Sequence, residues 1–498
     1  MKIFFKNSSF LLFLLLIIIG LAGVVGGVIA AAIVSFAVIF LVLVLIFFKF
    51  LPVEKFFTYP VFLVFFLSII GVLGFGATLK YHYEGGENYE FLRKKVLFIS
   101  AIPMTIVIMV KHRSMDLNRL KPLTKHKDKK RFERFIENKR DALLLLPRYD
   151  FILSRSVVDI VDINNFEIIH TYSHDVDEMN SKITNTKEFP RIKIDQSKER
   201  FRYFHPLLFE DGSLISMSEP AFKLDFCSNL QWINDDERFH HSIMLDHEEN
   251  IWIGGNMKPK SKYVKKYAIK SFSDDSIIKI NTDGKILYNK SITEILIENN
   301  IVADNFAFTS SLSNEKDPIH LNDIEPAFTD TKYLQQGDVF ISIRNQSAII
   351  HYRPSTNKVI NYITGPFARQ HDVDIISDKE ISILNNNNFL VNNKYSEVVI
   401  YNFETKKFRK LFNDQLQKEN FKTETAGLSN IFKDGSLLID ESNHGRLILF
   451  NSKGEKEWEF VNNDKNRDIG YVNWSRVIED ELFIEKFKSL VKNKKCLN

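Results

Sequence analysis

The stretch VVIYNFETKKFRKLF, residues 398–412, decides how the chain folds. It opens with a β-branched and aromatic run, continues through NFETK, which is polar apart from its Phe, and ends in a second run that mixes Phe and Leu with Lys and Arg. Short runs of this kind on either side of turn residues are typical of paired β-strands. The stretch therefore predicts a β-hairpin.

The same strand–turn–strand unit recurs through most of the chain. A second unit, a tight turn leading into a strand, precedes most copies, as in FEDGSLISM and FKDGSLLID. Together the two units give four strands per repeat. The hairpin copies occupy residues 157–172, 221–233, 277–289, 348–363, 398–412 and 447–460.

Six copies of a four-stranded unit predict an all-β domain, a six-bladed β-propeller. One blade is too small a sheet to bury its own faces, whereas blades stacked around an axis form a continuous core and hide their edges. The residues after Tyr471 are expected to close the ring or to cap it. The structural alternative is a pair of β-sandwiches.

The N-terminal part of the chain has a different character. No charged residue occurs from Asn7 to Phe48, roughly twice the ~20 apolar residues that cross a bilayer as one helix. We predict spans at residues 9–26 and 28–48 and a third at Phe56–Leu79, with a weaker candidate at Val96–Val110. The propeller is therefore expected to follow an N-terminal bundle of three to four transmembrane helices.

A segment rich in Lys and Arg joins these two parts. The predicted domains are a transmembrane region at 1–110, a basic juxtamembrane linker at 111–142 and a propeller at 143–498. The linker is interpreted as a solvated segment, with contact to anionic lipid head groups as the alternative. The oligomeric state cannot be predicted from the sequence.

Composition excludes several kinds of function. The net charge is +4, from 66 basic and 62 acidic residues, and this near balance gives no argument for nucleic-acid binding. Cys227 and Cys496 lie far apart and form no spaced cluster. We therefore expect neither a disulfide nor a thiolate zinc site.

Several histidines occupy matching places in the repeats. His371, in GPFARQHDVDII, lies seven residues before Asp378, near the start of the first strand of its repeat. His205 and His241 hold nearly the same position in their repeats, and His320 lies at the start of another repeat. In a fifth repeat, Leu428 and Ser429 hold this position. The innermost strands of a propeller line its central channel, so these side chains are predicted to converge. Gln370 and Asp372 are candidates for orienting the ring of His371.

One cation belongs to the same region of the predicted fold. Arg344, in GDVFISIRNQ, would interrupt an apolar strand, and Asn345 follows it. A guanidinium group matches the oxygens of sulfate or phosphate. The alternative is an arginine at a strand end, paired with a surface acid.

The segments HLNDIEP, GDVFISIRNQSAIIHY, GPFARQHDVDII and GRLILFNSKGEKEWEF resemble the bacterial aryl sulfotransferases over roughly His205 to Phe460. The resemblance implies a six-bladed propeller that moves a sulfuryl group from a phenolic sulfate ester to a phenol, without a nucleotide donor or another cofactor.

The resemblance also implies roles for individual residues. His371 matches the histidine that is transiently sulfated, and His320 and Arg344 match residues that hold the sulfuryl oxygens. His241 matches the remaining channel histidine. We predict that His205, His240 and Asn345 contact the substrate.

Other functions are compatible with a propeller. A non-catalytic, membrane-tethered propeller could bind a ligand or a protein partner. Three histidines could hold a metal ion, although a cation at Arg344 would repel it. A quinone-dependent dehydrogenase is disfavoured because only four tryptophans occur, without a regular repeat. Positive charge after the spans favours a cytoplasmic propeller, whereas the family likeness favours an extracytoplasmic one, which we expect.

Overall fold

A computed structural model of the chain describes residues 76, 125–137, 139–189, 192, 200–267, 272–301, 317–387 and 395–496. The predicted membrane spans lie outside these residues, apart from Gly76. None of the helices in these ranges is long and apolar enough to cross a membrane. The chain divides into two compact units, residues 1–119 and 120–498, and the description below concerns the second.

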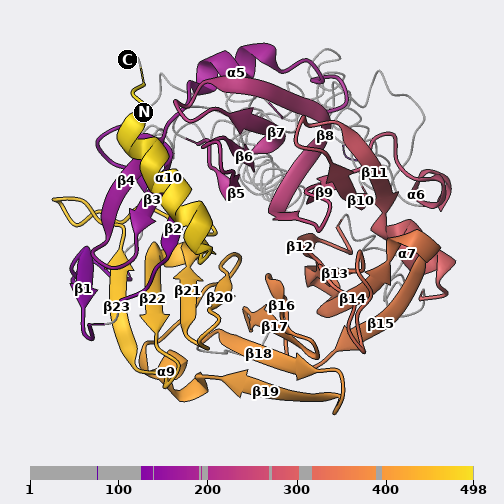
Figure 1. The fold of residues 1–498 in the computed structure, drawn as a ribbon. Helices are drawn as coiled ribbons and strands as arrows, with labels where there is room; N and C mark the ends of the chain where they lie inside the picture. The colour runs from indigo at the N-terminus through magenta and orange to yellow at the C-terminus, as the bar shows by residue number, and fades with distance from the viewer. Residues whose placement is uncertain are drawn as a thin grey trace, which may run out of the picture. The chain divides into compact units, whose positions relative to one another are not determined.

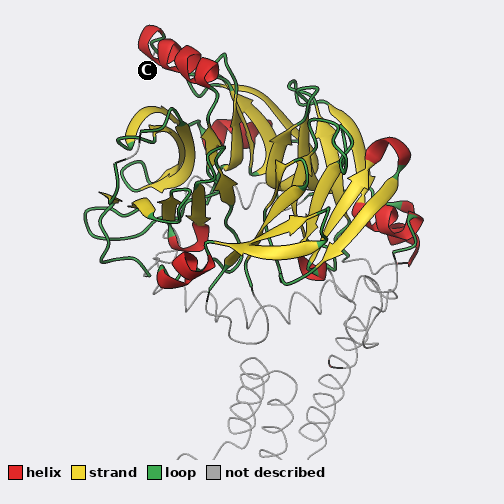
Figure 2. Ribbon diagram, turned by 60° about the horizontal axis from the view of Figure 1, so that its bottom comes forward, coloured by secondary structure: helices red, strands yellow, loops and turns green. Residues whose placement is uncertain are grey.

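The second unit contains five antiparallel sheets arranged radially about a central axis (Figure 1). This arrangement is propeller-like, and the alternative of two β-sandwiches is wrong. Figure 2 shows that strands make up most of the unit and that helices lie around its outside.

Three of the sheets have four strands and one has five. The sheet that combines the two ends of the unit contains β24 (Arg476–Ile478), β2 (Leu143–Asp150), β3 (Arg155–Asp162) and β4 (Glu167–Tyr172). The next contains β12 (Leu321–Pro326), β13 (Val339–Ile343), β14 (Ala348–Arg353) and β15 (Lys358–Thr364). It is followed by β16 (Val373–Ser377), β17 (Glu380–Asn385), β18 (Glu397–Asn402) and β19 (Lys407–Leu411). The five-stranded sheet contains β1 (Phe132–Arg134), β23 (Lys456–Val461), β22 (Arg446–Phe450), β21 (Leu437–Glu441) and β20 (Ser429–Ile431).

The seven-stranded sheet contains one strand with two sets of partners. Its strands are β5 (Phe204–Leu208), β6 (Leu214–Met217), β7 (Glu219–Leu224), β8 (Leu230–Leu245), β9 (Ile251–Asn256), β10 (Asp275–Ile280) and β11 (Ile286–Ser291). The first part of β8, up to Asn234, pairs mainly with β7, and the part from Arg238 pairs with β9. The sheet therefore consists of two four-stranded parts that share β8.

All six predicted hairpins pair as the sequence indicated. They are β3–β4, β7–β8, β10–β11, β14–β15, β18–β19 and β22–β23. In the hairpin at 398–412, the Asn402 side chain accepts hydrogen bonds from the backbone N–H groups of Glu404 and Thr405 at 3.1 and 2.9 Å. Lys406 then takes a left-handed conformation, with φ 56°. Side-chain bonds of this kind are what make Asn a turn residue.

The core lies between neighbouring sheets. Leu384, Val398 and Ile400 of one sheet pack with Ile439 and Ile448 of the next, and all are fully or almost fully buried. Burying a side chain of this size contributes roughly 1.5–3 kcal/mol. Since each sheet buries both of its faces in this way, no blade is stable without its neighbours.

Inner strands of adjacent sheets are also joined by hydrogen bonds from side chain to backbone. In each bond, a backbone N–H of one sheet donates to a Ser or Asp side chain of the preceding sheet. The bonds run from Ile324 to Ser242 (3.1 Å), from Val373 to Asp323 (2.8 Å), from Ser429 to Asp372 (2.8 Å) and from Ser475 to Asp440 (2.6 Å).

The C-terminal residues both close the ring and cap it. Strand β24 pairs with β2, with Arg476 opposite Leu145 and Ile478 opposite Leu143. Helix α10 (Glu481–Asn493) begins at the N-cap Asp480 and buries Ile484 and Phe487 in the cluster that includes Phe226. Shorter helices lie outside the strands, namely α5 (Val176–Lys182), α6 (Lys262–Tyr267), α7 (Ile292–Glu298) and α9 (Asn413–Lys418).

The expectation that the two cysteines stay unpaired is wrong. Cys227 and Cys496 form a disulfide, with their Cα atoms 5.4 Å apart. Cys227 lies in the turn between β7 and β8, and Cys496 follows α10, which packs against Phe226. A separation of 269 residues along the chain therefore gave no guide to their distance in space.

The end of the basic segment belongs to the propeller unit. Strand β1 pairs with β23, so the predicted linker at 111–142 extends too far. Glu441 is fully buried and contacts both Lys125 and His126. Burial opposes its ionisation, but the hydrogen bond with His126 and the charges of Arg446 and Lys125 lower the pKa of Glu441 to about 2.

We expect the variant C496S to be less stable than the wild type by about 2–4 kcal/mol, because the disulfide closes a long loop and restricts the unfolded chain. The measurement is the free energy of unfolding in urea, with C227S and the double variant C227S/C496S as controls. All three variants should lose the same amount. Titration of two free thiols in the non-reduced native protein would contradict this prediction.

Candidate active site

Three of the predicted histidines lie together at the centre of the unit. The ring of His241 has its centroid 5.2 Å from that of His320 and 6.2 Å from that of His371. His240 lies beside them, and its Nδ1 is 2.7 Å from Nδ1 of His241. Residues separated by up to 131 positions thus meet at one place, as the repeat pattern predicted.

The backbone at several of these matching positions has a positive φ angle. His205, His241 and His320 have φ angles of 41°, 70° and 54°. A left-handed conformation of a residue other than glycine costs on the order of 1–3 kcal/mol and is most frequent at functional sites. Near His371 the positive φ falls on Arg369, at 53°. The strained turn is therefore a shared property of the entries to the inner strands.

The local structure around His371 and Arg344 differs from the prediction. His371 lies two residues before β16, and its backbone N–H donates to the carbonyl of Leu384 at 3.1 Å. Arg344 does not interrupt a strand, because β13 ends at Ile343 and Arg344 begins a 3-10 turn (Arg344–Gln346). Its backbone N–H donates to the carbonyl of His320 at 2.9 Å, which places the guanidinium-bearing turn beside that histidine.

The ring of His371 is oriented by a residue that the sequence did not reveal. Its Nδ1 is 2.7 Å from Oδ1 of Asn386. The predicted partners are engaged elsewhere: the amide nitrogen of Gln370 donates to the carbonyl of Ala348, and the carboxylate of Asp372 accepts from Ser429. The proposal that Gln370 or Asp372 orients the ring is therefore wrong.

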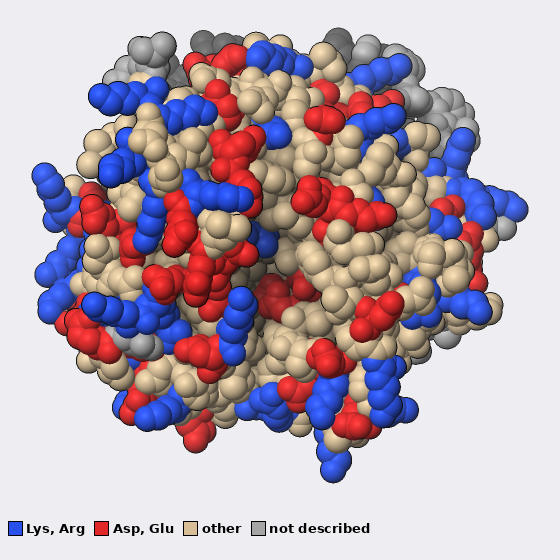
Figure 3. Space-filling view, viewed as in Figure 1, with Lys and Arg blue, Asp and Glu red and all other residues tan. Residues whose placement is uncertain are grey.

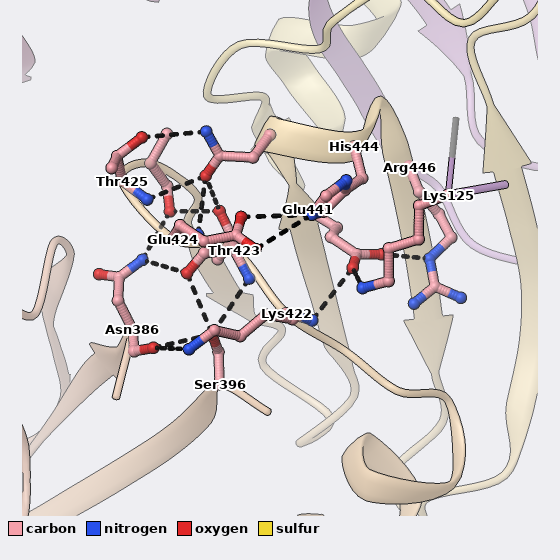
Figure 4. Close-up of polar contacts among 12 residues, drawn as sticks. Lys125, Asn386, Ser396, Lys422, Thr423, Glu424, Thr425, Glu441, His444 and Arg446 are labelled. Atoms are coloured by element: carbon pink, nitrogen blue, oxygen red, sulfur yellow. Dashed lines mark hydrogen bonds and ion pairs between the residues drawn. The ribbon is translucent and has the colours of Figure 1, made fainter. Parts of the chain in front are cut away.

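The surroundings of Asn386 settle which way its amide points (Figure 4). Its nitrogen donates to the carbonyls of Thr423 and Ala426 at 2.8 and 2.9 Å. A carbonyl oxygen can only accept, so the amide oxygen must be the atom that faces His371. Nδ1 of His371 therefore carries the proton and Nε2 keeps its lone pair.

Burial keeps this imidazole neutral. His371 is 1% exposed. Burial lowers its pKa to about 3; the hydrogen bond with Asn386 opposes this effect, and the charge of Arg344 adds to it. Burial likewise holds the pKa of His241 well below its usual range, with smaller effects from His240, His320 and Arg344. Both rings are uncharged at neutral pH.

His320 has a different environment, closer to the opening of the site. Its side chain is 30% exposed, and its Nδ1 contacts the carboxylate of Asp317 at 2.5 Å. Burial opposes ionisation of Asp317, but the hydrogen bond and charge of His320 lower the pKa of this carboxyl. The pair therefore has the arrangement that stabilises an imidazolium when the ring takes up a proton.

Asn345 supports this region from the side. Its amide oxygen accepts from the guanidinium of Arg344 at 2.9 Å, and its nitrogen donates to the carbonyl of Asp317 at 2.6 Å. Both ends of the side chain are thus used within the protein. Asn345 fixes the position of Arg344 relative to the His320–Asp317 pair.

His205 and Trp474 complete the inner wall. The ring centroid of Trp474 lies 6.1 Å from that of His205, 5.7 Å from that of His241 and 6.1 Å from that of His371. Burial holds the pKa of His205 well below its usual range, and the nearby charge of Arg476 adds to the effect. Trp474 was not predicted, although its place before Ser475 corresponds to that of Leu428 before Ser429.

A layer of carboxylates lies further along the channel. Asp323, Glu325, Asp372 and Asp374 are all in or next to inner strands, and burial raises the pKa of each, that of Asp323 to about 6. All four act electrostatically on Arg476, which donates to the carbonyl of Ile243 at 2.7 Å. On the face shown in Figure 3, acidic side chains border the central hollow.

A metal centre is not supported by the described residues. Within them, no three His, Cys, Asp or Glu side chains are grouped so that they could hold a metal ion. A guanidinium whose charge reaches His241 and His371 fits an anionic ligand better than a cation.

The sequence was compared with models of known protein families. The model of the family described as arylsulfotransferase (ASST) matches residues 205–463, just over half of the chain. The chain belongs to the arylsulfotransferase family. The match includes every candidate residue named from the sequence, and it ends before Trp474. No curated protein matches the sequence.

Solved structures with a similar arrangement are remote from this arylsulfotransferase. A protein of unknown function from Bacteroides caccae is 11% identical, with 68% of this chain and 99% of that chain covered and a TM-score of 0.42. A virginiamycin B lyase from Staphylococcus aureus is 13% identical, with 53% and 71% covered and a TM-score of 0.30. Neither likeness carries an argument about function.

The buried imidazole of His371 predicts a pH-dependent stability. Between pH 6.5, the ordinary histidine pKa, and about 3, the unfolded chain binds more protons than the folded one, so stability falls as the pH falls. The variant H371N lacks this effect. We expect the wild type to lose stability relative to H371N by up to about 1.4 kcal/mol per pH unit below 6.5. Urea unfolding of both proteins at pH 7.5, 6 and 5 measures the difference, and a constant difference would refute the assigned charge state.

Proposed function

We propose that the protein is an aryl sulfotransferase that moves a sulfuryl group from an aryl sulfate to a phenol through a sulfated His371. Membership of the arylsulfotransferase family supports a transferase of this type. The observation that carries the residue assignment is the Asn386 contact, since it leaves Nε2 of His371 unprotonated beside two further histidines and an arginine.

In the first half-reaction, Nε2 of His371 attacks the sulfur of the donor. An N–S bond forms, the S–O bond to the arene breaks, and the electron pair leaves with the phenolate. A neutral imidazole needs no deprotonation before it attacks, so its low pKa favours this role at neutral pH. As the nucleophile gains positive charge, Oδ1 of Asn386 accepts from its Nδ1–H and stabilises it.

Arg344 and the His320–Asp317 pair serve the other reacting groups. The Arg344 guanidinium stabilises negative charge on the sulfuryl oxygens. His320 gives a proton to the leaving phenolate and later takes one from the acceptor phenol. Asp317, whose carboxylate contacts Nδ1 of His320, stabilises the protonated ring before the first of these steps and again after the second.

In the second half-reaction, the acceptor oxygen attacks the same sulfur. The N–S bond breaks and the neutral imidazole of His371 is restored. One proton enters with the acceptor phenol and one leaves with the product phenol, so no cofactor or outside proton source is needed. Two half-reactions through one intermediate give ping-pong kinetics.

We also infer that the propeller has six blades. The two four-stranded parts of the seven-stranded sheet count as two blades that share β8, and the other sheets give four more. The six strained or glycine-containing entries to the inner strands fit this count: they are at His205, His241, His320, Arg369, Gly427 and Trp474.

We further propose that the protein is anchored in a membrane and that the propeller is extracytoplasmic. The uncharged segment from Asn7 to Phe48 supports the anchor. The disulfide between Cys227 and Cys496 supports the location, because disulfides persist mainly in oxidising compartments.

The variant H371N is expected to lose transfer between 4-nitrophenyl sulfate and phenol, with at least a thousandfold drop in kcat/KM, because the covalent step loses the imidazole that Asn386 orients. Mass spectrometry of the wild type after brief incubation with the donor should find one sulfuryl group on His371. The control is H247N, which changes an exposed histidine away from the site. Full transfer by H371N would show that the nucleophile is misassigned.

The proposed location predicts the behaviour of a reporter joined to the C-terminus. An alkaline phosphatase fusion is active only where disulfides form, so it should be active in intact cells, whereas a fluorescent protein that folds only in the cytoplasm should stay dark. The opposite pattern would place the propeller in the cytoplasm.

A further inference from the structure

Trp474 holds a place in the ring where other sheets carry histidine. It lies two residues before β24, with φ 53°, and the same backbone occurs at His241 and His320. In the neighbouring sheet the positive φ falls one place earlier, on Gly427, at 105°, and Leu428 holds the place that corresponds to Trp474. The correspondence is fixed by the serines that follow, since Ser475 bonds Asp440 as Ser429 bonds Asp372.

A tryptophan is costly at this position. Left-handed backbone is an outlier for a bulky side chain, whereas glycine adopts it freely. Because Leu428 holds the corresponding place without a left-handed backbone, the fold itself does not require an aromatic residue there. The side chain of Trp474, and not its backbone, must explain why it is present.

The indole of Trp474 has an unmet hydrogen bond. Trp474 is 3% exposed, and its Nε1–H has no acceptor among the described residues. By contrast, Nε1 of the part-buried Trp232 donates to the carbonyl of Thr282 at 3.0 Å. A buried donor without a partner costs about 1–3 kcal/mol, so the position is best explained by an acceptor that arrives from outside.

The unmet donor lies next to the reacting histidine. The ring centroids of Trp474 and His371 are 6.1 Å apart, and the two rings meet nearly edge to face at 81°. An indole N–H can donate but not accept. It therefore suits an anionic oxygen, which is a stronger acceptor than the oxygen of a neutral phenol.

We propose that Trp474 is a substrate-binding residue whose indole N–H donates a hydrogen bond to a sulfuryl oxygen of the aryl sulfate. This inference rests on the proposed function. Arg344 approaches the sulfuryl group from the β13–β14 turn, and Trp474 approaches it from the segment before β24. The two donors together would hold the group in place over Nε2 of His371.

Binding to a protein that cannot react tests the proposal. Full-length H371N is titrated with phenyl sulfate by calorimetry, and so is H371N/W474F, which keeps an aromatic ring but lacks the N–H. We expect about tenfold weaker binding of phenyl sulfate after the second change, and unchanged binding of phenol. The matched control is H371N/W458F, since Trp458 is buried in β23, away from the site.

A second measurement covers the case in which W474F does not fold. The indole ¹H–¹⁵N signals of H371N are recorded with and without phenyl sulfate, and that of Trp474 is assigned by elimination with Phe variants of the other three tryptophans. The Trp474 signal is expected to move downfield on binding. An unmoved signal would overturn the inference.

The outcomes separate this inference from the proposed function. If the wild type transfers no sulfuryl group but Trp474 still governs binding of phenyl sulfate, the function fails and the binding site stands. If the wild type transfers normally and W474F binds phenyl sulfate as tightly as its parent, the function stands and the role of Trp474 is overturned. If phenyl sulfate binds neither variant nor parent, the role of Trp474 is also overturned.

Discussion

The site depends on how each inner strand is fixed to the one before it. A Ser or Asp side chain of one sheet accepts a hydrogen bond from the backbone of the next, as Asp323 does from Val373 and Asp372 does from Ser429. These bonds set the height of each strand along the axis. Because His371 and Trp474 directly precede such bonded residues, their rings meet only if the bonds hold. The geometry of the candidate site thus depends on the contacts between sheets and not on any single sheet.

The channel has two electrostatic layers. In one layer, the neutral imidazoles of His241 and His371 lie near the partly exposed His320–Asp317 contact and the Arg344 guanidinium. In the other layer, buried carboxylates surround Arg476, whose pKa burial lowers to about 10 and which therefore stays charged. A layer that holds neutral bases next to a cation is suited to a nucleophile and an anion, whereas the carboxylate layer is not.

The parts of the structure that could be predicted depend on local sequence. The hairpin at 398–412 follows from its own apolar runs and turn residues, and the meeting of His241, His320 and His371 follows from the repetition of such units. The partner of His371 could not be found in this way. Asn386 comes from the turn after β17, within a run of four asparagines, and only the folded loop distinguishes it from its neighbours. Cys227 and Cys496 likewise meet only through the packing of α10.

The carboxylate layer affects the route by which substrates reach His371. His371 is almost fully buried, and it shares the lining of a small cavity with Asp323 and Asp372, whose carboxyl groups offer an anionic sulfate no favourable charge. In the proposed reaction, an anionic donor is therefore expected to approach His371 from the side of the partly exposed His320 and of Arg344, and the spent phenol to leave by that side. If both molecules use this one access route, the phenol released from the donor must leave before the acceptor phenol can enter. The order of the proposed two-step transfer then follows from access to the site, before any difference in affinity between donor and acceptor is considered.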